Sequence, residues 1–179
     1  YRYPSADPDV DGLVAFLTDE KETDELYMVV DEELKMMTQV CAGNECRVKG
    51  PMLREMARVA HTEYQIHGRT TLDVRVALRE TLVAPTVTGS PIENACRVIA
   101  RHETTGRGYY SGIIALLGHH DGAQTLDSAI MIRTAEIDSD GQMCLGVGAT
   151  LVRHSDPRAE VAETTAKAAA MVRVLGAPP

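Results

Sequence analysis

Residues 109–118 (YYSGIIALLG), 126–137 (LDSAIMIRTAEI) and 142–152 (QMCLGVGATLV) form a consecutive run of apolar segments. Each is typical of a strand, and DSDG at 138–141 is a hairpin-turn signal. Helical patterns precede this run, and one more follows it: residues 13–41 with a weak break near Thr18–Asp19, residues 73–82, Pro91 to about Glu103, and the last segment of the chain. Helices followed by consecutive strands and one last helix favour an α+β fold in which an antiparallel sheet packs with helices.

The middle of the chain gives weaker signals. AGNECRVKGP at 42–51 and TVTGSP at 86–91 predict turns. A short helix is expected around Met52–Ala60. It should lead into a strand at HTEYQIHG (61–68), where apolar and polar side chains alternate.

Composition limits the classes of protein that the chain can represent. It has 179 residues, 44% of them hydrophobic, which is enough for one domain with a core. The net charge of −8 disfavours nucleic acid and anionic membrane as partners. Because the sequence lacks an apolar run of membrane-spanning length, a signal-peptide pattern and a zinc-ligand spacing, we expect a cytoplasmic protein whose four cysteines are reduced.

The last segment, SDPRAEVAETTAKAAAMVRVLG (155–176), predicts a helix with Asp156 as N-cap and Pro157 at its first position. Glu160, Glu163 and Lys167 fall within an arc of about 60° on this helix, which is apolar on nearly every other side. Two interpretations stay open. The three residues form either an i,i+4 Glu163–Lys167 pair that lies partly in solvent or a functional site.

A second acidic pair, Glu22 and Glu25, lies on the apolar side of the predicted helix at 13–41. Carboxylates gathered in one cleft repel each other unless a cation compensates them. Mg²⁺ suits such a site, because it takes one or two protein carboxylates and completes its shell with water and substrate oxygens. The alternative is an acidic first turn that the helix dipole favours.

Other side chains offer weaker hints, and each has an ordinary structural explanation. Arg133 follows the apolar alternation of AIMIRT, so it is expected to extend from a sheet face, where it binds a carboxylate or faces solvent. Tyr110 and Thr86 carry hydroxyls beside glycine-containing turns, and the backbone around Gly148 can approach an anion. His61 begins its strand and is a candidate acid or base near neutral pH.

Taken in order, these segments resemble the chorismate-utilising enzymes, which include anthranilate, aminodeoxychorismate, isochorismate and salicylate synthases. The resemblance runs from about Lys21 to Lys167 and rests on six motifs: KETDELYMVVD, HTEYQIHG, TVTGSP, RGYYSG, IMIRT and VGATLVRHSDPRAEVAETTAK. It implies an α+β fold like that of anthranilate synthase component I. It also implies that residues 1–179 are the C-terminal part of a single synthase domain whose N-terminal part lies outside this chain.

The resemblance also implies roles for the candidate residues. Glu25 and Glu163 match the direct Mg²⁺ ligands, and Glu22 and Glu160 lie behind them. Thr86, Tyr110, Arg133, Gly148 and Lys167 match positions that hold the carboxylates of chorismate. His61 matches the histidine associated with chemistry at the ring.

Departures from the family pattern narrow the expected reaction. Leu26, Ile92 and Thr150 replace residues usual in the family, and GSPIENACRVIARHE looks most like the 2-amino-2-deoxyisochorismate synthases of phenazine and enediyne pathways. The expected function is therefore Mg²⁺-dependent amination of chorismate with ammonia from glutamine. The product would be 2-amino-2-deoxyisochorismate or, with loss of pyruvate, anthranilate.

The expected partners are chorismate and a glutamine amidotransferase domain or subunit, and a homo-oligomer is compatible with the sequence. The alternatives are an isochorismate or salicylate synthase that uses water, and a non-catalytic fragment that a partner completes. The chain alone is expected to be inactive, because the family's nucleophile-handling residue and general acid lie outside it.

Overall fold

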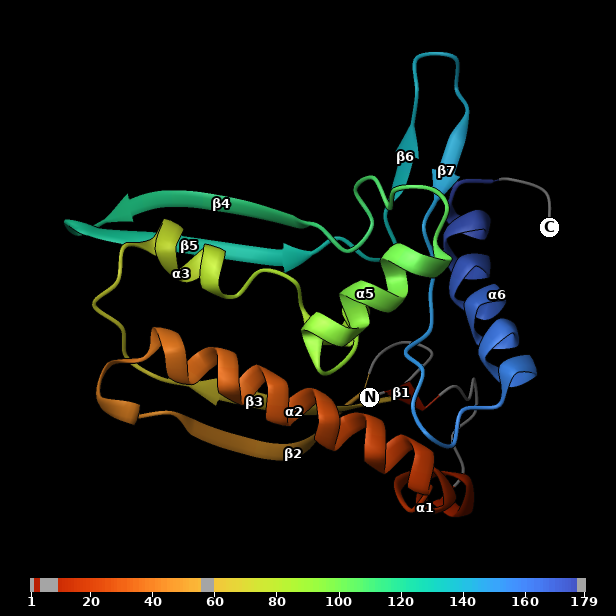
Figure 1. Cartoon of the computed structure of the whole chain (residues 1–179), viewed down its shortest axis with the longest axis horizontal. Coiled ribbons are helices and arrows are strands. Elements are labelled where there is room, and N and C mark those ends of the chain that lie inside the picture. Colours follow the sequence, from red (N-terminus) through yellow and green to blue (C-terminus); the bar gives the residue numbers. More distant parts are fainter. Residues whose placement is uncertain (1, 4–9, 56–59, 177–179) are drawn as a thin grey trace. The chain divides into compact units, whose positions relative to one another are not determined.

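The computed structural model of the chain describes residues 2–3, 10–55 and 60–176. The chain, whose elements are labelled in Figure 1, divides into two compact units. Unit 1 comprises Tyr1–Leu72 and Val152–His154, and unit 2 comprises Asp73–Leu151 and Ser155–Pro179. The described parts combine helices with small antiparallel sheets, so the predicted α+β class is confirmed.

Unit 1 begins with β1 (Arg2–Tyr3), α1 (Val10–Leu17) and the long helix α2 (Glu20–Val40). The predicted break at Thr18–Asp19 separates the two helices. Thr18 Oγ1 donates to the Val14 carbonyl at 2.8 Å and closes α1, while Asp19 accepts from the Glu22 amide at 3.0 Å and caps α2. Met36 and Val40 of α2 supply the buried apolar side chains of this unit among the described residues.

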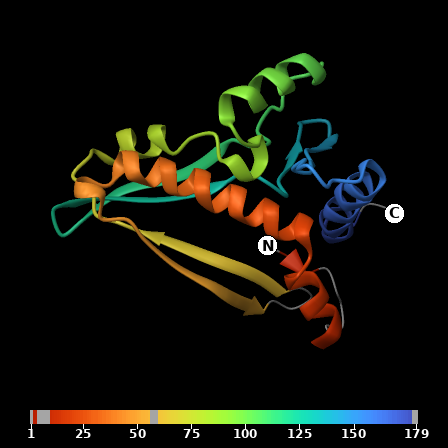
Figure 2. The same ribbon diagram turned by 60° about the horizontal axis from the view of Figure 1, so that its bottom comes forward.

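After the short 3₁₀ turn η1 (Ala42–Asn44), the chain forms an antiparallel hairpin of β2 (Arg47–Glu55) and β3 (Ala60–His67). β1 pairs with the other edge of β3, so the strand order is β1-β3-β2. The register of β2 shifts between Lys49 and Met52, where Gly50–Pro51 interrupts the ladder. Figure 2 shows α2 running along this hairpin.

Unit 2 begins with α3 (Val74–Glu80), α4 (Pro85–Thr88) and α5 (Ile92–His102). β4 (Ile113–His120) and β5 (Ala123–Ile130) form a hairpin through Asp121 and Gly122, which both have positive φ as a two-residue turn requires. Gln124 of β5 accepts from the Val74 amide at 3.2 Å and donates to Asp73 at 3.1 Å, which fixes the start of α3 against β5.

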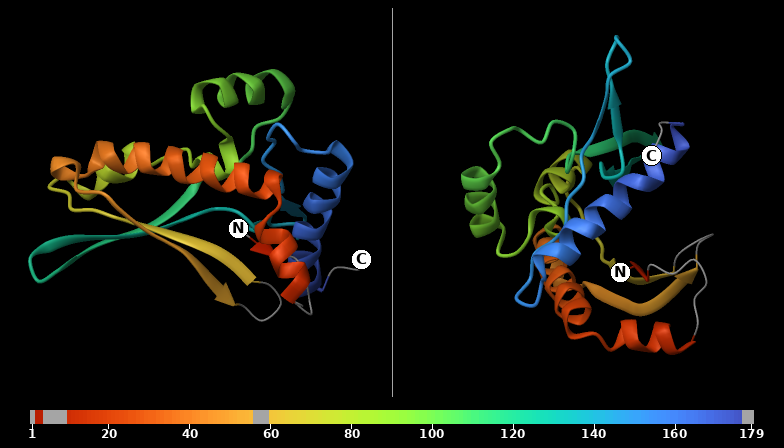
Figure 3. Two further views of the ribbon diagram at one scale, coloured as in Figure 1. Left: turned by 90° about the horizontal axis from the view of Figure 1, so that it is seen from below. Right: turned by 90° about the vertical axis from the view of Figure 1, so that its right-hand side faces the viewer.

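The remaining elements of unit 2 are β6 (Ala135–Ile137), β7 (Met143–Leu145) and α6 (Pro157–Val174). The predicted DSDG turn joins β6 to β7, and Asp138 accepts from the Asp140 and Gln142 amides at 2.9 and 2.8 Å. α6 is one continuous helix (Figure 3). No described helix has the length and apolar character that crossing a membrane requires.

Several local predictions are wrong. The strand expected at 126–137 is divided between β5 and β6, and within 142–152 only Met143–Leu145 forms a strand. Residues 52–55 belong to β2 and not to a helix, because pairing with β3 overrides their helical propensity; residues 56–59 lie outside the described part of the chain. Arg47–Pro51 is strand and not turn, for the same reason. Thr86–Thr88 forms the single helical turn of α4, and the expected turn begins only at Gly89, where φ is 101°.

Candidate active site

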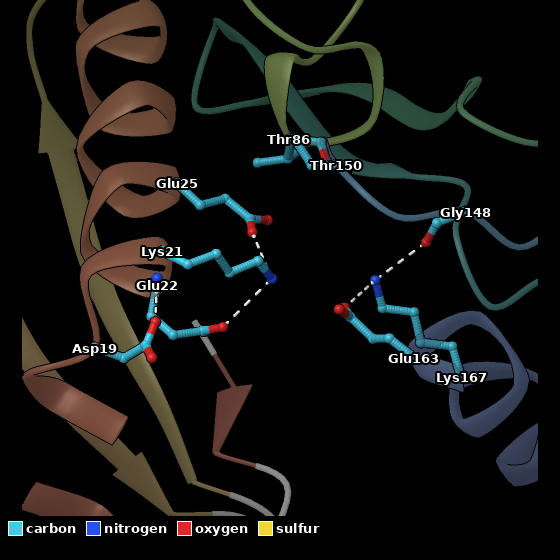
Figure 4. Close-up of polar contacts among 9 residues, drawn as sticks. All are labelled: Asp19, Lys21, Glu22, Glu25, Thr86, Gly148, Thr150, Glu163 and Lys167. Carbon is cyan, nitrogen blue, oxygen red and sulfur yellow. Dashed lines mark hydrogen bonds and ion pairs between the residues drawn. The ribbon is translucent and has the colours of Figure 1, made fainter. Parts of the chain in front are cut away.

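The acidic pair of unit 1 lies in the first turns of α2. Glu22 and Glu25 are half-buried, with side chains 21% and 19% exposed. Lys21 Nζ lies 3.3 Å from Glu22 Oε1 and 3.4 Å from Glu25 Oε2, so one ammonium binds both carboxylates (Figure 4). The spacing along the helix brings the two carboxylates together, and a cation already compensates their charge.

The acidic pair of unit 2 lies near the start of α6. Asp156 caps this helix as predicted, accepting from the Arg158 and Ala159 amides at 3.1 and 2.9 Å. Glu160 is buried, at 5% exposed, and Glu163 is half-exposed. A buried carboxylate needs a cation or hydrogen-bond donors close to it to compensate its charge.

Lys167 connects this pair to a distant loop of unit 2. Its ammonium lies 2.6 Å from Glu163 Oε1 and donates to the Gly148 carbonyl at 3.1 Å (Figure 4). The pair is therefore more than a solvent-exposed i,i+4 contact, because the same ammonium also fixes the backbone at Gly148. Three residues named from the sequence meet here.

Tyr110 packs directly on the same loop. A Cβ added at Gly146 would lie 2.6 Å from Tyr110 Cβ, and one added at Gly148 would lie 2.6 Å from the Tyr110 hydroxyl oxygen. A methyl group at position 146 would therefore meet the fixed Cβ of Tyr110, and one at position 148 would meet the hydroxyl end of its side chain. The Tyr110 hydroxyl, the Gly148 backbone and the Lys167 ammonium together offer polar groups around one short stretch of chain.

The electrostatics around Tyr110 keep its hydroxyl protonated. Burial raises the pKa of Tyr110 above its ordinary value, the nearby charges of Arg107 and Arg133 oppose that rise, and Glu103 adds to it. A neutral phenol at physiological pH can donate a hydrogen bond to an anionic ligand.

Arg107 holds Tyr110 in place. Its guanidinium donates to both carboxylate oxygens of Glu103 at 2.8 and 2.6 Å and to the Val87 carbonyl at 3.1 Å. It also lies 5.7 Å from the centroid of the Tyr110 ring. This one side chain therefore connects the end of α5, the helical turn of α4 and the tyrosine.

Thr86 and Arg133 complete the predicted set in unit 2. Thr86 is exposed, and its carbonyl accepts from Thr150 Oγ1 at 3.0 Å, which joins α4 to the loop that carries Gly148. The prediction that Arg133 extends from a strand is wrong. It lies between β5 and β6 with φ of 51°, where it is exposed and close enough to Tyr110 to affect the pKa of its hydroxyl.

Unit 2 thus gathers the predicted Thr86, Tyr110, Gly148, Glu163 and Lys167 through hydrogen bonds, an ion pair and close packing on the loop at 146–150, with Arg133 beside Tyr110. His61 lies in β3, and its side chain is outside what the structure describes. No role was predicted from the sequence for Lys21, Arg107 or Thr150. Lys21 begins the KETDE motif and Arg107 begins the RGYYSG motif. Their place in these motifs was the signal that could have identified them.

The donors present fit a hard divalent cation such as Mg²⁺. In each unit a glutamate carboxylate binds a lysine ammonium, and Glu22 and Glu25 bind the same one. These carboxylate oxygens therefore already bind a cationic group. Carboxylate oxygens are the protein ligands that Mg²⁺ takes. Within the described residues no three His, Cys, Asp or Glu side chains gather in a metal-binding group, so neither pair by itself is a complete protein cage.

Comparison with known proteins places this geometry in a family. The sequence profile of the chorismate binding enzymes matches residues 5–173. The chain therefore belongs to the chorismate-binding enzyme family.

Its relatives include the protein named anthranilate synthase, phenazine specific, of Pseudomonas chlororaphis. That protein is 58% identical over 176 residues, which cover 98% of this chain and 28% of the relative. The protein of the same name from Pseudomonas fluorescens gives the same identity and coverage. The chain thus spans about 28% of the length of these two relatives.

More distant relatives are also named anthranilate synthases. Anthranilate synthase component 1 of Streptomyces coelicolor is 33% identical over 174 residues, or 96% of this chain and 33% of that protein. The crystal structure of anthranilate synthase component I from Streptococcus pneumoniae matches with a TM-score of 0.75 and 32% identity, covering 94% of this chain and 38% of that one. The expected fold, that of part of an anthranilate synthase component I domain, is confirmed.

Proposed function

We propose that this chain is the C-terminal, chorismate-holding part of a synthase that aminates chorismate, with ammonia from glutamine and with Mg²⁺ as cofactor. The product is 2-amino-2-deoxyisochorismate or, after pyruvate elimination, anthranilate. The observation that carries the proposal is the Lys167 ammonium bound to the Gly148 carbonyl beside the Tyr110 hydroxyl, in a chain of the chorismate-binding family.

The substrate is a dianion, and the chain itself has a net charge of −8, so local cations have to bind the two carboxylates. Lys167 and Arg133, which both follow Tyr110 in the sequence, supply fixed positive charge. The Tyr110 hydroxyl and the backbone around Gly148 supply neutral polar groups, and Thr86 supplies a further hydroxyl. Charge-assisted hydrogen bonds of this kind orient a carboxylate more strongly than neutral ones do.

The proposed Mg²⁺ ligands are Glu25 and Glu163, with Glu22 and Glu160 behind them. The ion would neutralise the substrate's ring carboxylate, which these four glutamates would otherwise repel. The ammonium already held by Glu22 and Glu25, and the buried state of Glu160, support this assignment. His61 is the proposed residue for proton transfer at the ring.

The proposed partner is a glutamine amidotransferase domain or subunit as the source of ammonia. The residue that handles the nucleophile and the general acid for hydroxyl departure are proposed to lie in another part of the synthase. The 179-residue chain alone should therefore give no turnover.

Product analysis tests the reaction. The complete synthase is incubated with chorismate, Mg²⁺ and either ammonia or glutamine, and the products are separated by chromatography and identified by mass. An aminated product supports the proposal. Isochorismate or salicylate as the main product, formed with water, would overturn the amination.

Calorimetry tests the metal without turnover. Chorismate is titrated into the protein with Mg²⁺ and, separately, with excess chelator. We expect binding to be lost in chelator, and equal binding in both would contradict the proposal. Glu25→Asp should weaken binding nearly as much as Glu25→Ala, because Mg²⁺ tolerates deviations of only about 0.1 Å in ligand distance.

A further inference from the structure

Two of the four cysteines lie side by side in unit 1. Cys41 directly follows α2, and Cys46 directly precedes β2. The four residues between them form a tight turn, in which Gly43 adopts φ of 66°. This turn returns the chain toward its starting point and brings the second thiol back to the first.

The two side chains face the same small space, because both sulfur atoms lie within 3.5 Å of the point where a Cβ at Gly68 would be. The neighbouring Cys46 thiol and burial raise the pKa of the Cys41 thiol. Both residues are free cysteines and are only partly buried, so a small reagent can reach them.

The surroundings hold this arrangement in place. Gly68 follows β3 and leaves the space that the two sulfur atoms occupy: a Cβ built there would collide with Cys41 Sγ and lie 3.5 Å from Cys46 Sγ. The Ala42 amide donates to the Arg69 carbonyl at 2.7 Å, and the Cys41 amide donates to the Met37 carbonyl at 2.9 Å. Backbone contacts on both sides therefore fix the first thiol and its turn.

We propose that Cys41 and Cys46 form a reversible intramolecular disulfide when the protein meets a small disulfide oxidant of the glutathione class. A thiolate of the pair attacks one sulfur of the oxidant, and one glutathione thiol leaves. The second protein thiol then attacks the mixed disulfide, and the second glutathione leaves. Two protein thiols lose two electrons and two protons, and one oxidant molecule becomes two thiols.

The product closes a ring across the turn that joins α2 to β2. α2 carries Glu22 and Glu25 in its first turns, so oxidation covalently fixes the far end of the helix that bears the acidic pair. The chemistry of the pair does not depend on the amination reaction, and the proposal stands or fails without it.

Cys96 and Cys144 are matched controls within the same chain. They lie on separate elements, α5 and β7, and both are exposed. An exposed single thiol stops at the mixed disulfide with glutathione, whereas an adjacent pair goes on to the internal bond because the second thiol has a high effective concentration.

The experiment equilibrates the protein with reduced and oxidised glutathione at a series of ratios, blocks the thiols with acid and an alkylating reagent, and digests with a protease that cleaves after glutamate. Cleavage after Glu45 separates Cys41 from Cys46, so only a disulfide keeps residues 34–45 and 46–55 together in the mass spectrum. We expect this linked pair to exceed separate adducts at Cys41 and Cys46 by on the order of tenfold, while Cys96 and Cys144 carry glutathione.

Two variants make the result decisive. Cys96→Ser combined with Cys144→Ser should leave the linked pair unchanged. Gly68→Ala should lower its yield several-fold, because the added methyl displaces Cys41 Sγ; circular dichroism checks that this variant is folded. Separate glutathione adducts on Cys41 and Cys46 at every ratio, or an unchanged yield in folded Gly68→Ala, would overturn the proposal.

Discussion

Replacing Arg107 by lysine should destabilise the protein while keeping the positive charge. The guanidinium makes three hydrogen bonds at 2.6–3.1 Å and a cation–π contact with Tyr110. Lysine can keep one contact with Glu103 but cannot reproduce the fork or reach Val87 at the same time. Arg107→Lys therefore tests the contacts that the guanidinium makes with Glu103, Val87 and Tyr110, and not its charge.

The structure sets the size of the effect. Hydrogen bonds to charged groups contribute about 1.5–3 kcal/mol when buried, but the Glu103 side chain is 40% exposed, so solvent screening reduces its share to about 1 kcal/mol. The bond to the Val87 carbonyl and the aromatic contact add about 1 kcal/mol together, part of which lysine retains. We expect a loss of about 1–2 kcal/mol, or a fall in Tm of about 2–8 °C.

Thermal and urea unfolding measure this loss. Arg101→Lys, at an exposed arginine near the end of α5, is the control and should change the free energy of unfolding by less than about 0.5 kcal/mol. Equal effects of the two substitutions would show that the contacts of the Arg107 guanidinium do not stabilise the fold. Glu103→Gln and the double variant complete a cycle that isolates the Arg107–Glu103 coupling.

The pH dependence gives an independent check on the same pair. The guanidinium lowers the pKa of Glu103 below its ordinary value of 4.5. A lowered pKa means that the pair stabilises the fold above about pH 4.5 and loses that contribution as the pH falls through the native pKa. The difference between the parent protein and Arg107→Lys should therefore shrink in acid; a difference that stays constant would assign the loss to Val87 and Tyr110.

Four other substitutions test the site. Lys167→Met should raise the KM for chorismate of the complete synthase by about 10- to 100-fold, the range of a charge-assisted bond, and an unchanged KM would leave Lys167 a purely structural role. Lys21→Met should tighten Mg²⁺ binding in calorimetry several-fold, because it removes the ammonium that competes for Glu22 and Glu25; weaker binding would count against that competition. Gly146→Ala should cost about 1–3 kcal/mol of stability, since its methyl meets the fixed Cβ of Tyr110, whereas Gly148→Ala meets only the movable hydroxyl end and should alter KM more than Tm. Equal loss of stability in both glycine variants, measured by thermal unfolding, would contradict this distinction.

The sequence was sufficient where a signal is local. α6 begins at Pro157 behind the Asp156 cap, as expected, because both residues act through their own neighbouring amides. The two glutamate pairs were likewise visible, since their spacing along a helix fixes which side chains are adjacent. The DSDG turn and the break at Thr18–Asp19 belong to the same class of local signals.

The sequence was insufficient where contacts between distant segments determine the local structure. Residues 52–55 favour a helix by composition, yet the ladder to β3 makes them strand. Arg133 continues an apolar alternation, yet the chain turns at positive φ after β5 ends at Ile130. The bonds from Lys167 to Gly148 and from Thr150 to Thr86 join positions 19 and 64 residues apart, and no spacing rule predicts such contacts.

The discontinuity of unit 1 has a consequence for how the protein can be made and cut. Residues 152–154 belong to unit 1, where His154 lies 3.8 Å from Asp24 of α2, although Asp73–Leu151 of unit 2 precede them in the chain. On the ribosome, unit 1 cannot acquire this segment until β4 to β7 have been synthesised. No single proteolytic cut yields both units whole: cleavage after Leu72 leaves unit 1 without residues 152–154, and cleavage after His154 separates α6 from the loop that its lysine binds.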